Sequence, residues 1–209
     1  MNEITINKEK LAEVYQNASA ETKEALKALF GDKIEFKREP TLDDYTTIKT
    51  YEDACEALGV EPIFNEPNPI MNLYGVEYEV EPHIIALMKL ETISRALWGR
   101  TWKPEPEKKN SKWFYYPVFA LYTQSEITNM GEDKRGFLLS AYADGGAYVS
   151  FGYLSTAYRS SFSLAYSGFR LCQETSEKAK YFGKQFIELW AEYLKFNFEV
   201  GEKLNNTRN

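Results

Sequence analysis

The stretch from residue 136 to residue 172 limits the fold more than any other part of the chain, because it is almost free of charge. Its 37 residues include three charged side chains, nine Phe or Tyr, seven Ser and five Gly. Aromatic and small polar residues of this kind suit a pleated, half-buried surface, and glycines suit its corners. The stretch therefore predicts tightly turned antiparallel strands.

The predicted sheet begins upstream of this stretch, where aromatic residues lead into an apolar run. Asp144-Gly145-Gly146 is typical of the tight turn of a hairpin. Asn129, Gly131 and Asp133 predict a mobile connection. About four or five strands are expected: strands at 114–123, 136–143 and 147–152, a strand or folded loop at 153–167, and a closing segment at 168–173.

Two long helices are expected to cover this sheet. Pro82 and Gly99 delimit an apolar helix at 82–98. Thr175 can cap a second helix at 175–196, within which Gly183 lets another backbone approach closely. Each helix carries one broad apolar stripe that needs a partner layer. The predicted fold class is therefore α+β, with an antiparallel sheet packed against two longer helices.

The N-terminal part is expected to be separate and helical. Apolar residues at helical spacing predict a helical hairpin at 7–31, and a stretch without apolar period at 32–47 predicts a loose connection. Thr50 and Asp53 form a capping-box pattern for a helix that ends at Gly59. The predicted organisation is a helical segment at 1–31, an α+β domain at 48–198 and a flexible tail at 199–209.

Charge and cysteine usage bear on partners and compartment. The net charge is −7 over residues 1–110 and +1 over residues 111–209, which disfavours free nucleic acid or an anionic membrane as a partner of the N-terminal half. There is no run of 18 apolar residues and no apolar leader. Cys55 and Cys172 have apolar neighbours and no CxxC pattern, which favours buried thiols over a disulfide. A cytoplasmic protein is expected.

No stretch has the spacing that a known catalytic or metal chemistry requires, so no catalytic residue, metal or cofactor is predicted. His83, the only histidine, falls in the first turn of the helix at 82–98 and is expected on the surface. Two groups of glutamates each have a functional alternative. Glu77, Glu79 and Glu81, on one face of a predicted strand, could hold a hard cation, and Glu188 and Glu192, one turn apart on the predicted last helix, could act as enzyme carboxylates. A solvated strand face and a solvated helix face are favoured for the two groups.

Two candidate binding surfaces follow from the aromatic residues. Tyrosines with serines provide large contact area and adaptable hydrogen bonds, and an arginine beside them adds a planar donor. The first set is Tyr142, Tyr148, Tyr153, Tyr158, Arg159, Tyr166 and Arg170. The alternative set is Trp102, Lys103, Trp113 and Tyr115, with Lys108, Lys109 and Lys112 nearby. Rings interleaved with lysines suit the binding of single-stranded nucleic acid. The structural interpretation is that the rings begin a strand and the lysines lie in a solvated loop.

Several blocks of the chain resemble a known group of proteins. IKTYEDACEALG, ISRALW with WKP, KWFYYPVF and SGFRLCQETSEKAKYFGKQFIELW, after a two-helix leader, are similar to uncharacterised proteins of phages and prophages of gut Bacteroidetes. This resemblance implies no activity and places the chain in the cytoplasm of a host cell. Residues 147–172 also resemble the end of the C-type-lectin-like Fibrobacter succinogenes major paralogous domain. They differ from it by Leu171 between Arg170 and Cys172, by longer strand spacing and by the helix that follows.

The function predicted from these patterns is a non-enzymatic binding module. Its partner is expected to be a protein or a glycan held on the aromatic and serine-rich sheet surface. The alternative is a nucleic-acid accessory protein that acts through residues 102–116.

Overall fold

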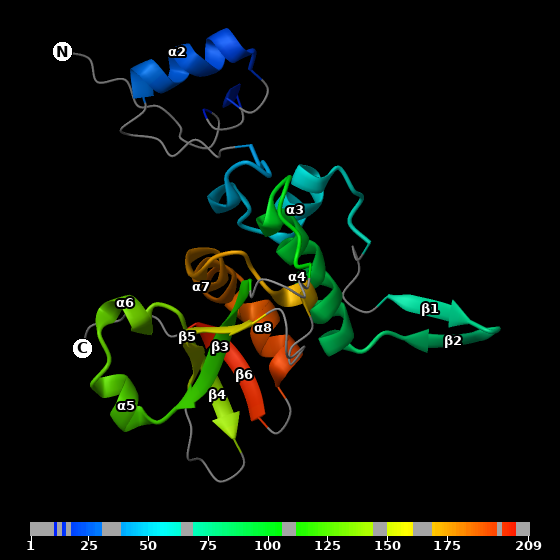
Figure 1. The fold of residues 1–209 in the computed structure, drawn as a ribbon, viewed down its shortest axis with the longest axis vertical. Coiled ribbons are helices and arrows are strands. Elements are labelled where there is room, and N and C mark those ends of the chain that lie inside the picture. Colours follow the sequence, from blue (N-terminus) through cyan, green and yellow to red (C-terminus); the bar gives the residue numbers. More distant parts are fainter. Residues whose placement is uncertain are drawn as a thin grey trace. The chain divides into compact units, whose positions relative to one another are not determined.

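The computed structural model describes residues 11, 14–15, 18–30, 39–63, 69–105, 112–143, 150–160, 169–195 and 198–203. The chain divides into two compact units, Met1–Glu39 and Pro40–Asn209. Helices and antiparallel strands together confirm the predicted α+β class (Figure 1). None of the described helices is long and apolar enough to cross a membrane.

The first unit contains helix α2 (Ala20–Phe30). The Ser19 side chain accepts a hydrogen bond from the Thr22 backbone N–H at 3.3 Å, as a residue at the start of a helix does. Lys23 forms an ion pair with Glu39, and its ammonium lies 5.8 Å from the centre of the Tyr15 ring. Of the earlier helix of the predicted hairpin, residues 11, 14 and 15 are described, and they are helical.

The second unit is built on an antiparallel sheet with the strand order β3-β5-β4-β6. The strands are β3 (Trp113–Tyr122), β4 (Leu138–Ala143), β5 (Ser150–Ser160) and β6 (Phe198–Lys203). The segments predicted separately at 147–152 and 153–167 meet in the single strand β5, which pairs with β3 along its whole length. The predicted turn at 144–146 lies outside the described residues.

Two predictions for the ends of the sheet are wrong. Residues 198–203, predicted to begin a flexible tail, form β6 and pair with β4. Residues 169–171, predicted to close the sheet as a strand, form the short 3-10 helix η2 (Phe169–Leu171) instead. Only the bridge between Tyr115 and Gln173 joins that part of the chain to the sheet among the described residues. Both pairings join residues distant in sequence, which a local pattern does not reveal.

The helix predicted at 82–98 is confirmed as α4 (Pro82–Trp98), and the helix predicted at 175–196 is two helices. These are α7 (Ser176–Gln185) and α8 (Ile187–Leu194), separated by Phe186, whose backbone has φ −109° and ψ 31°. Neither Gly nor Pro causes this break. Phe186 is 5% exposed and packs among Phe182 and the helices of the core, so burial of its ring outweighs helical continuity.

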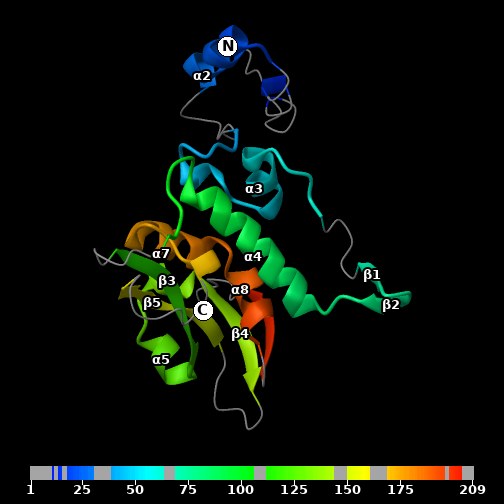
Figure 2. The ribbon, with the colours of Figure 1, turned by 45° about the vertical axis from the view of Figure 1, so that its right-hand side comes forward.

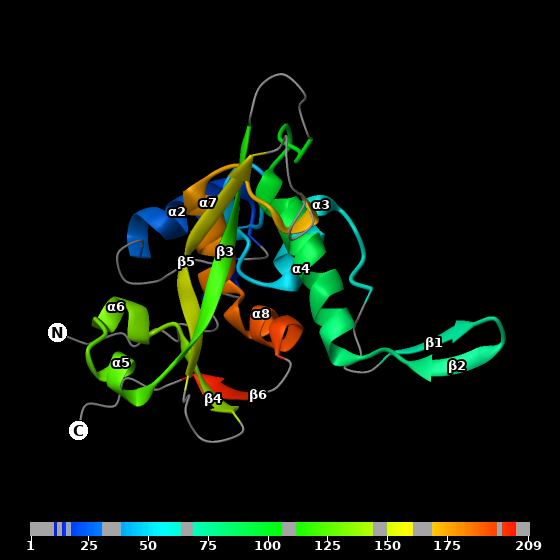
Figure 3. The same cartoon turned by 60° about the horizontal axis from the view of Figure 1, so that its bottom comes forward.

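The helices form layers on one side of the sheet. α7 contacts β3 and β5, and α8 packs Ile187 and Ala191 against Leu139 and Phe151 of the sheet. α4 was expected directly on the sheet, but it packs mainly on α8 and on α3 (Tyr51–Leu58). α7 and α8 therefore lie between α4 and the sheet (Figure 3). α7 and α8, which follow β3, β4 and β5 in sequence, cover the sheet directly, and α4 forms the next layer.

Local signals place α3 and the segment before it. Thr50 and Asp53 make the predicted capping box, and Gly59 ends α3 with φ 66°, a left-handed conformation that suits glycine. Ile48, fully buried, belongs to the same core as α3 and α4. Residues 40–47, predicted as part of a loose connection, pack on this core through Leu42 and Tyr45.

The connection predicted around residues 129–133 lies at the junction of two short helices that were not predicted, and its mobility stays a prediction. They are α5 (Gln124–Thr128) and α6 (Glu132–Arg135). Thr123 and Glu126 form a second capping box at the start of α5. Ile127 then packs against Tyr122 and Leu138, which holds the segment to the sheet.

A two-stranded hairpin, β1 (Ile70–Leu73) and β2 (Val76–Glu79), precedes α4. It extends from the N-terminal end of α4, whereas α3 lies beside the C-terminal half of that helix (Figure 2). All side chains of both strands are exposed. The strand expected where Val76, Tyr78 and Val80 alternate with glutamates is confirmed as β2, and its partner β1 follows a stretch of sequence with three prolines.

Candidate functional site: the open edge of β3

The first predicted binding set is only partly brought together. Tyr148 and Tyr166 lie outside the described residues, as does the side chain of Tyr142 on β4. Tyr153 and Tyr158 lie on β5, on the face of the β3–β5 pair that α7 and α8 cover in part.

Tyr153 supports the fold. Its ring lies 2.9 Å from where a β-carbon would stand at Gly183 of α7, and its hydroxyl shares a 2.6 Å hydrogen bond with the hydroxyl of Thr156. The sequence predicts a close backbone approach at Gly183, and this is confirmed by Pro117 of β3 at the same point. Tyr153 is therefore committed to packing between sheet and helix.

Tyr158 joins the two predicted sets. It lies opposite Tyr115 in the β3–β5 register, with ring centres 6.1 Å apart, and its ring meets that of Trp113 edge-on at 4.9 Å. Trp113 is 50% exposed and Tyr158 is 54% exposed. These three side chains form an aromatic cluster at one end of β3, open to solvent.

The two arginines do not complete this cluster. Arg159 lies opposite Phe114, so strand alternation puts it on the other face from Tyr158, where it donates to the Tyr158 backbone carbonyl at 2.8 Å. Arg170 is exposed and forms an ion pair with Glu91 of α4. The guanidinium fork expected beside the rings is therefore engaged elsewhere in both cases.

Trp102, from the alternative set, is committed to the fold. Its ring meets Trp98 edge-on at 6.0 Å and Phe114 at 5.8 Å, and Phe114 is 2% exposed. Lys103 and Lys112 are exposed, whereas Lys108 and Lys109 lie outside the described residues. Of the alternative set, Trp113 and Tyr115 belong to the aromatic cluster.

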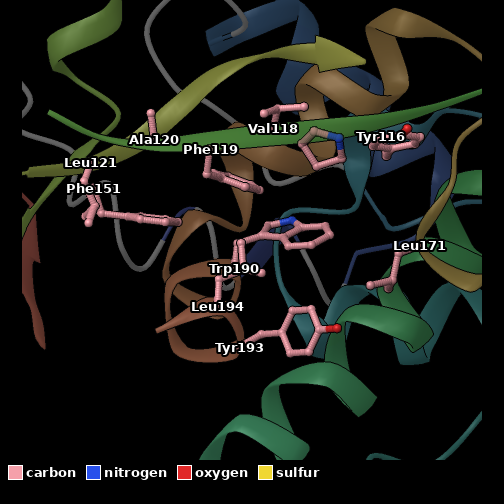
Figure 4. A pocket seen from close by; sticks show the side chains of 11 residues that line it. Tyr116, Val118, Phe119, Ala120, Leu121, Phe151, Leu171, Trp190, Tyr193 and Leu194 are labelled. Carbon is pink, nitrogen blue, oxygen red and sulfur yellow. The ribbon is translucent and has the colours of Figure 1, made fainter. Parts of the chain in front are cut away.

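An apolar cavity of about 520 Å³, which was not predicted from the sequence, lies between β3 and α8. Figure 4 shows Phe119 pointing from β3 toward Trp190, with Tyr193 and Leu194 on the helix below and Leu171 to one side. The Phe119 and Trp190 rings lie 5.2 Å apart. The lining comprises Tyr116, Pro117, Val118, Phe119, Ala120, Leu121, Phe151, Leu171, Trp190, Tyr193 and Leu194.

The cavity lies beside the outer edge of β3. β3 is one of the two outer strands of the sheet, β6 being the other, and Tyr115 exchanges both backbone hydrogen bonds with Gln173, at 3.0 Å and 2.7 Å, on the side away from β5. Backbone groups alternate in direction along an antiparallel strand. Those of Pro117, Phe119 and Leu121 therefore also point away from β5, where β3 has no partner strand among the described residues.

The chemistry of this site is that of binding. The described lining contains no carboxylate, imidazole, amine or thiol, and its side-chain polar groups are the hydroxyls of Tyr116 and Tyr193 and the indole N–H of Trp190. That N–H already donates to the Phe182 carbonyl at 3.2 Å. Apolar walls with a few polar groups are typical of sites that hold an apolar group of a ligand.

The thiols and glutamates form no reactive or metal-binding site among the described residues. Cys55 and Cys172 are buried, and neither forms a disulfide. Burial raises the pKa of Cys172 to about 11 and also raises the pKa of Cys55, so both resist forming the reactive thiolate. No three His, Cys, Asp or Glu side chains of the described part come together as a metal site. His83 is exposed, as predicted.

Searches of known protein families, curated protein sequences and solved structures find nothing that matches this chain. The two resemblances noted in the sequence therefore stay predictions.

Proposed function

We propose that this protein is an interaction module that binds an extended peptide segment along the free edge of β3. The observation that carries the proposal is the apolar cavity beside a strand edge that no described strand covers. Peptides that add a strand to a sheet gain affinity from main-chain hydrogen bonds and specificity from pockets that accept alternate side chains. Both elements are present at β3.

The backbone defines where such a peptide lies. Phe119 and Leu121 each offer an N–H and a carbonyl, and Pro117 offers a carbonyl alone because proline has no N–H. The bridge between Tyr115 and Gln173 occupies the edge beyond Pro117. A bound strand therefore ends before Tyr115, and it spans about five residues, or roughly 16 Å at the rise of an extended chain.

The cavity defines the side chains that such a peptide carries. Every second residue of an added strand faces the cavity, so we expect apolar or aromatic residues two apart, with polar residues between them. The aromatic cluster of Trp113, Tyr115 and Tyr158 gives flanking residues of the partner a second contact surface. This arrangement favours a protein over a glycan as the partner.

Single-stranded nucleic acid is less well supported, since the Trp102 ring that would stack on a base already packs between Trp98 and Phe114. No observation on the described residues favours that alternative.

A display library of random ten-residue peptides tests the proposal, with the protein immobilised at low density so that copies do not meet. We expect enriched peptides with apolar residues two apart that bind the wild type. Leu194→Asp, at a 39% exposed position in the cavity wall, should abolish their binding. Leu154→Asp is the matched control, because Leu154 is 48% exposed on β5 and does not line the cavity. Equal binding by both variants would contradict the proposal.

A further inference from the structure

The β1–β2 hairpin, Ile70–Glu79, is called the arm here, because it extends away from the sheet of its own unit in two different views (Figures 1 and 3). Every side chain of its strands is exposed. Two strands alone are marginally stable in water, and they gain stability when a further layer or strand covers them. The arm is therefore an element that a partner would stabilise.

The two faces of the arm differ in chemistry. Met71 lies opposite Tyr78 and Leu73 opposite Val76, so strand pairing puts these four apolar side chains on one face. The Tyr78 hydroxyl lies 3.9 Å from the Met71 sulfur, as this face requires. The exposed fractions are 42% for Met71, 49% for Leu73, 63% for Val76 and 42% for Tyr78. The opposite face carries Ile70, Asn72, Glu77 and Glu79.

The arm is a formed hairpin with a fixed base. Tyr74 and Gly75 make its turn with φ of 54° and 79°, the two positive angles of the tight turn that matches strand twist. Val80, next to β2, is 4% exposed and packs against Ile85 of α4. In this structure the arm extends away from β3 of its own chain, so the partner considered is another molecule.

We propose that the occupant of the β3 edge is the arm of a second copy of this chain, exchanged reciprocally in a dimer. This inference rests on the proposed function and names its partner. Placed parallel to β3, β1 presents what the edge requires. Its outward backbone groups belong to Ile70 and Asn72, so the apolar side chains of Met71 and Leu73, two apart, face the cavity, and the strand is about 13 Å long at the rise of an extended chain. The free edge from Pro117 to Leu121 is of similar length.

The charges on the arm indicate which strand pairs. β1 has no charged residue, whereas β2 carries Glu77 and Glu79. Pairing of β1 with β3 leaves β2 as the new outer strand, and carboxylates on an outer strand oppose addition of further chains. Exchange in both directions closes the assembly at two copies.

Sedimentation of the full chain over a range of concentrations tests the exchange. We expect the wild type and Leu154→Asp to dimerise. Leu73→Asp on the arm and Leu194→Asp in the cavity wall should each weaken dimerisation by roughly 30-fold or more, the effect of losing a central interface contact. Val76→Lys, at a 63% exposed position, is a second arm variant. Unchanged circular dichroism establishes that each variant is folded.

An equimolar mixture of Leu73→Asp and Leu194→Asp provides the decisive result. One intact arm then meets one intact cavity, so the mixture should form dimers that neither variant forms alone. A dimer disrupted by Leu73→Asp but not by Leu194→Asp would overturn the proposal in favour of pairing between arms. A monomeric wild type would also overturn it, and peptides that still bind this monomer and lose binding in Leu194→Asp would leave the proposed function standing.

Discussion

Replacement of Gly183 by alanine tests how closely α7 sits on the sheet that carries the proposed site. A β-carbon at this position would lie 2.5 Å from the β-carbon of Pro117 and 2.9 Å from a ring carbon of Tyr153. Carbon atoms in contact normally lie about 3.5–4.0 Å apart. The Pro117 ring cannot rotate away, and the Tyr153 hydroxyl is held by Thr156 at 2.6 Å. The helix itself must therefore retreat by about 1 Å.

Two opposing effects set the magnitude. Alanine is a better helix former than glycine by about 1 kcal/mol. Overpacking in a well-packed core costs about 1–3 kcal/mol, and we expect the upper end because the obstructing atoms belong to a proline and a fixed ring. The net loss in the free energy of unfolding should be about 1–2 kcal/mol. For a protein of this size that corresponds to a fall in Tm of about 2–8 °C.

Urea unfolding followed by tryptophan fluorescence measures this loss, because all four tryptophans lie in the second unit. Gly136→Ala is the matched control: Gly136 has φ −61°, and the atom nearest to its added carbon would be 3.9 Å away. That variant should be as stable as the wild type or slightly more so. If Gly183→Ala were stabilised by the helix-propensity gain alone, the close seating of α7 on β3 would be refuted.

Three further predictions concern the core of the second unit. Asp53→Ala should lower stability by about 1–3 kcal/mol in urea unfolding, since the 1% exposed carboxylate accepts two backbone N–H groups at 3.0 Å; an unchanged midpoint would contradict this. Burial raises the pKa of Tyr181 to about 12 and that of Cys172 to about 11, so the unfolded state loses these protons first and stability should fall as pH rises from about 9 to 12. Tyr181→Phe, which removes the 3.0 Å hydrogen bond to the Ile48 carbonyl, should flatten this fall above pH 10, and an equally steep fall would disprove the assignment. Cys55 and Cys172 should resist alkylation in the native protein and give two modified thiols after unfolding without reductant, whereas recovery of a disulfide would refute the prediction.

The sequence predicts those elements whose signals are local. The capping box of Thr50 and Asp53, the end of α3 at Gly59 and the start of α4 at Pro82 each depend on residues within one helical turn, and the structure confirms all three. The close approach at Gly183 is also confirmed, although its partner Pro117 could not be identified from the sequence.

Elements that depend on distant contacts were predicted less well. The pairing of β6 with β4 joins Phe198 to Ala143, and nothing in the local sequence of the tail indicates it. The break at Phe186 results from burial of its ring in the core, which overrides an apolar stripe that continues into α8. The cavity could not be predicted from local patterns either, because β3, η2 and α8 contribute its walls from distant parts of the chain.

The arm shows where a correct local prediction still leaves the function open. Alternation of Val76 and Tyr78 with Glu77 and Glu79 predicts a strand with one apolar face, and β2 has that form. Alternation normally implies that the apolar face is buried, yet Val76 is 63% exposed and Tyr78 is 42% exposed. Carboxylates on the other face oppose edge-to-edge addition of further chains, but they do not account for an exposed apolar face. A second molecule that covers this face resolves the discrepancy. Of the two outer strands of the described sheet, β3 is the one with an apolar cavity beside it, so its edge suits a strand of this kind.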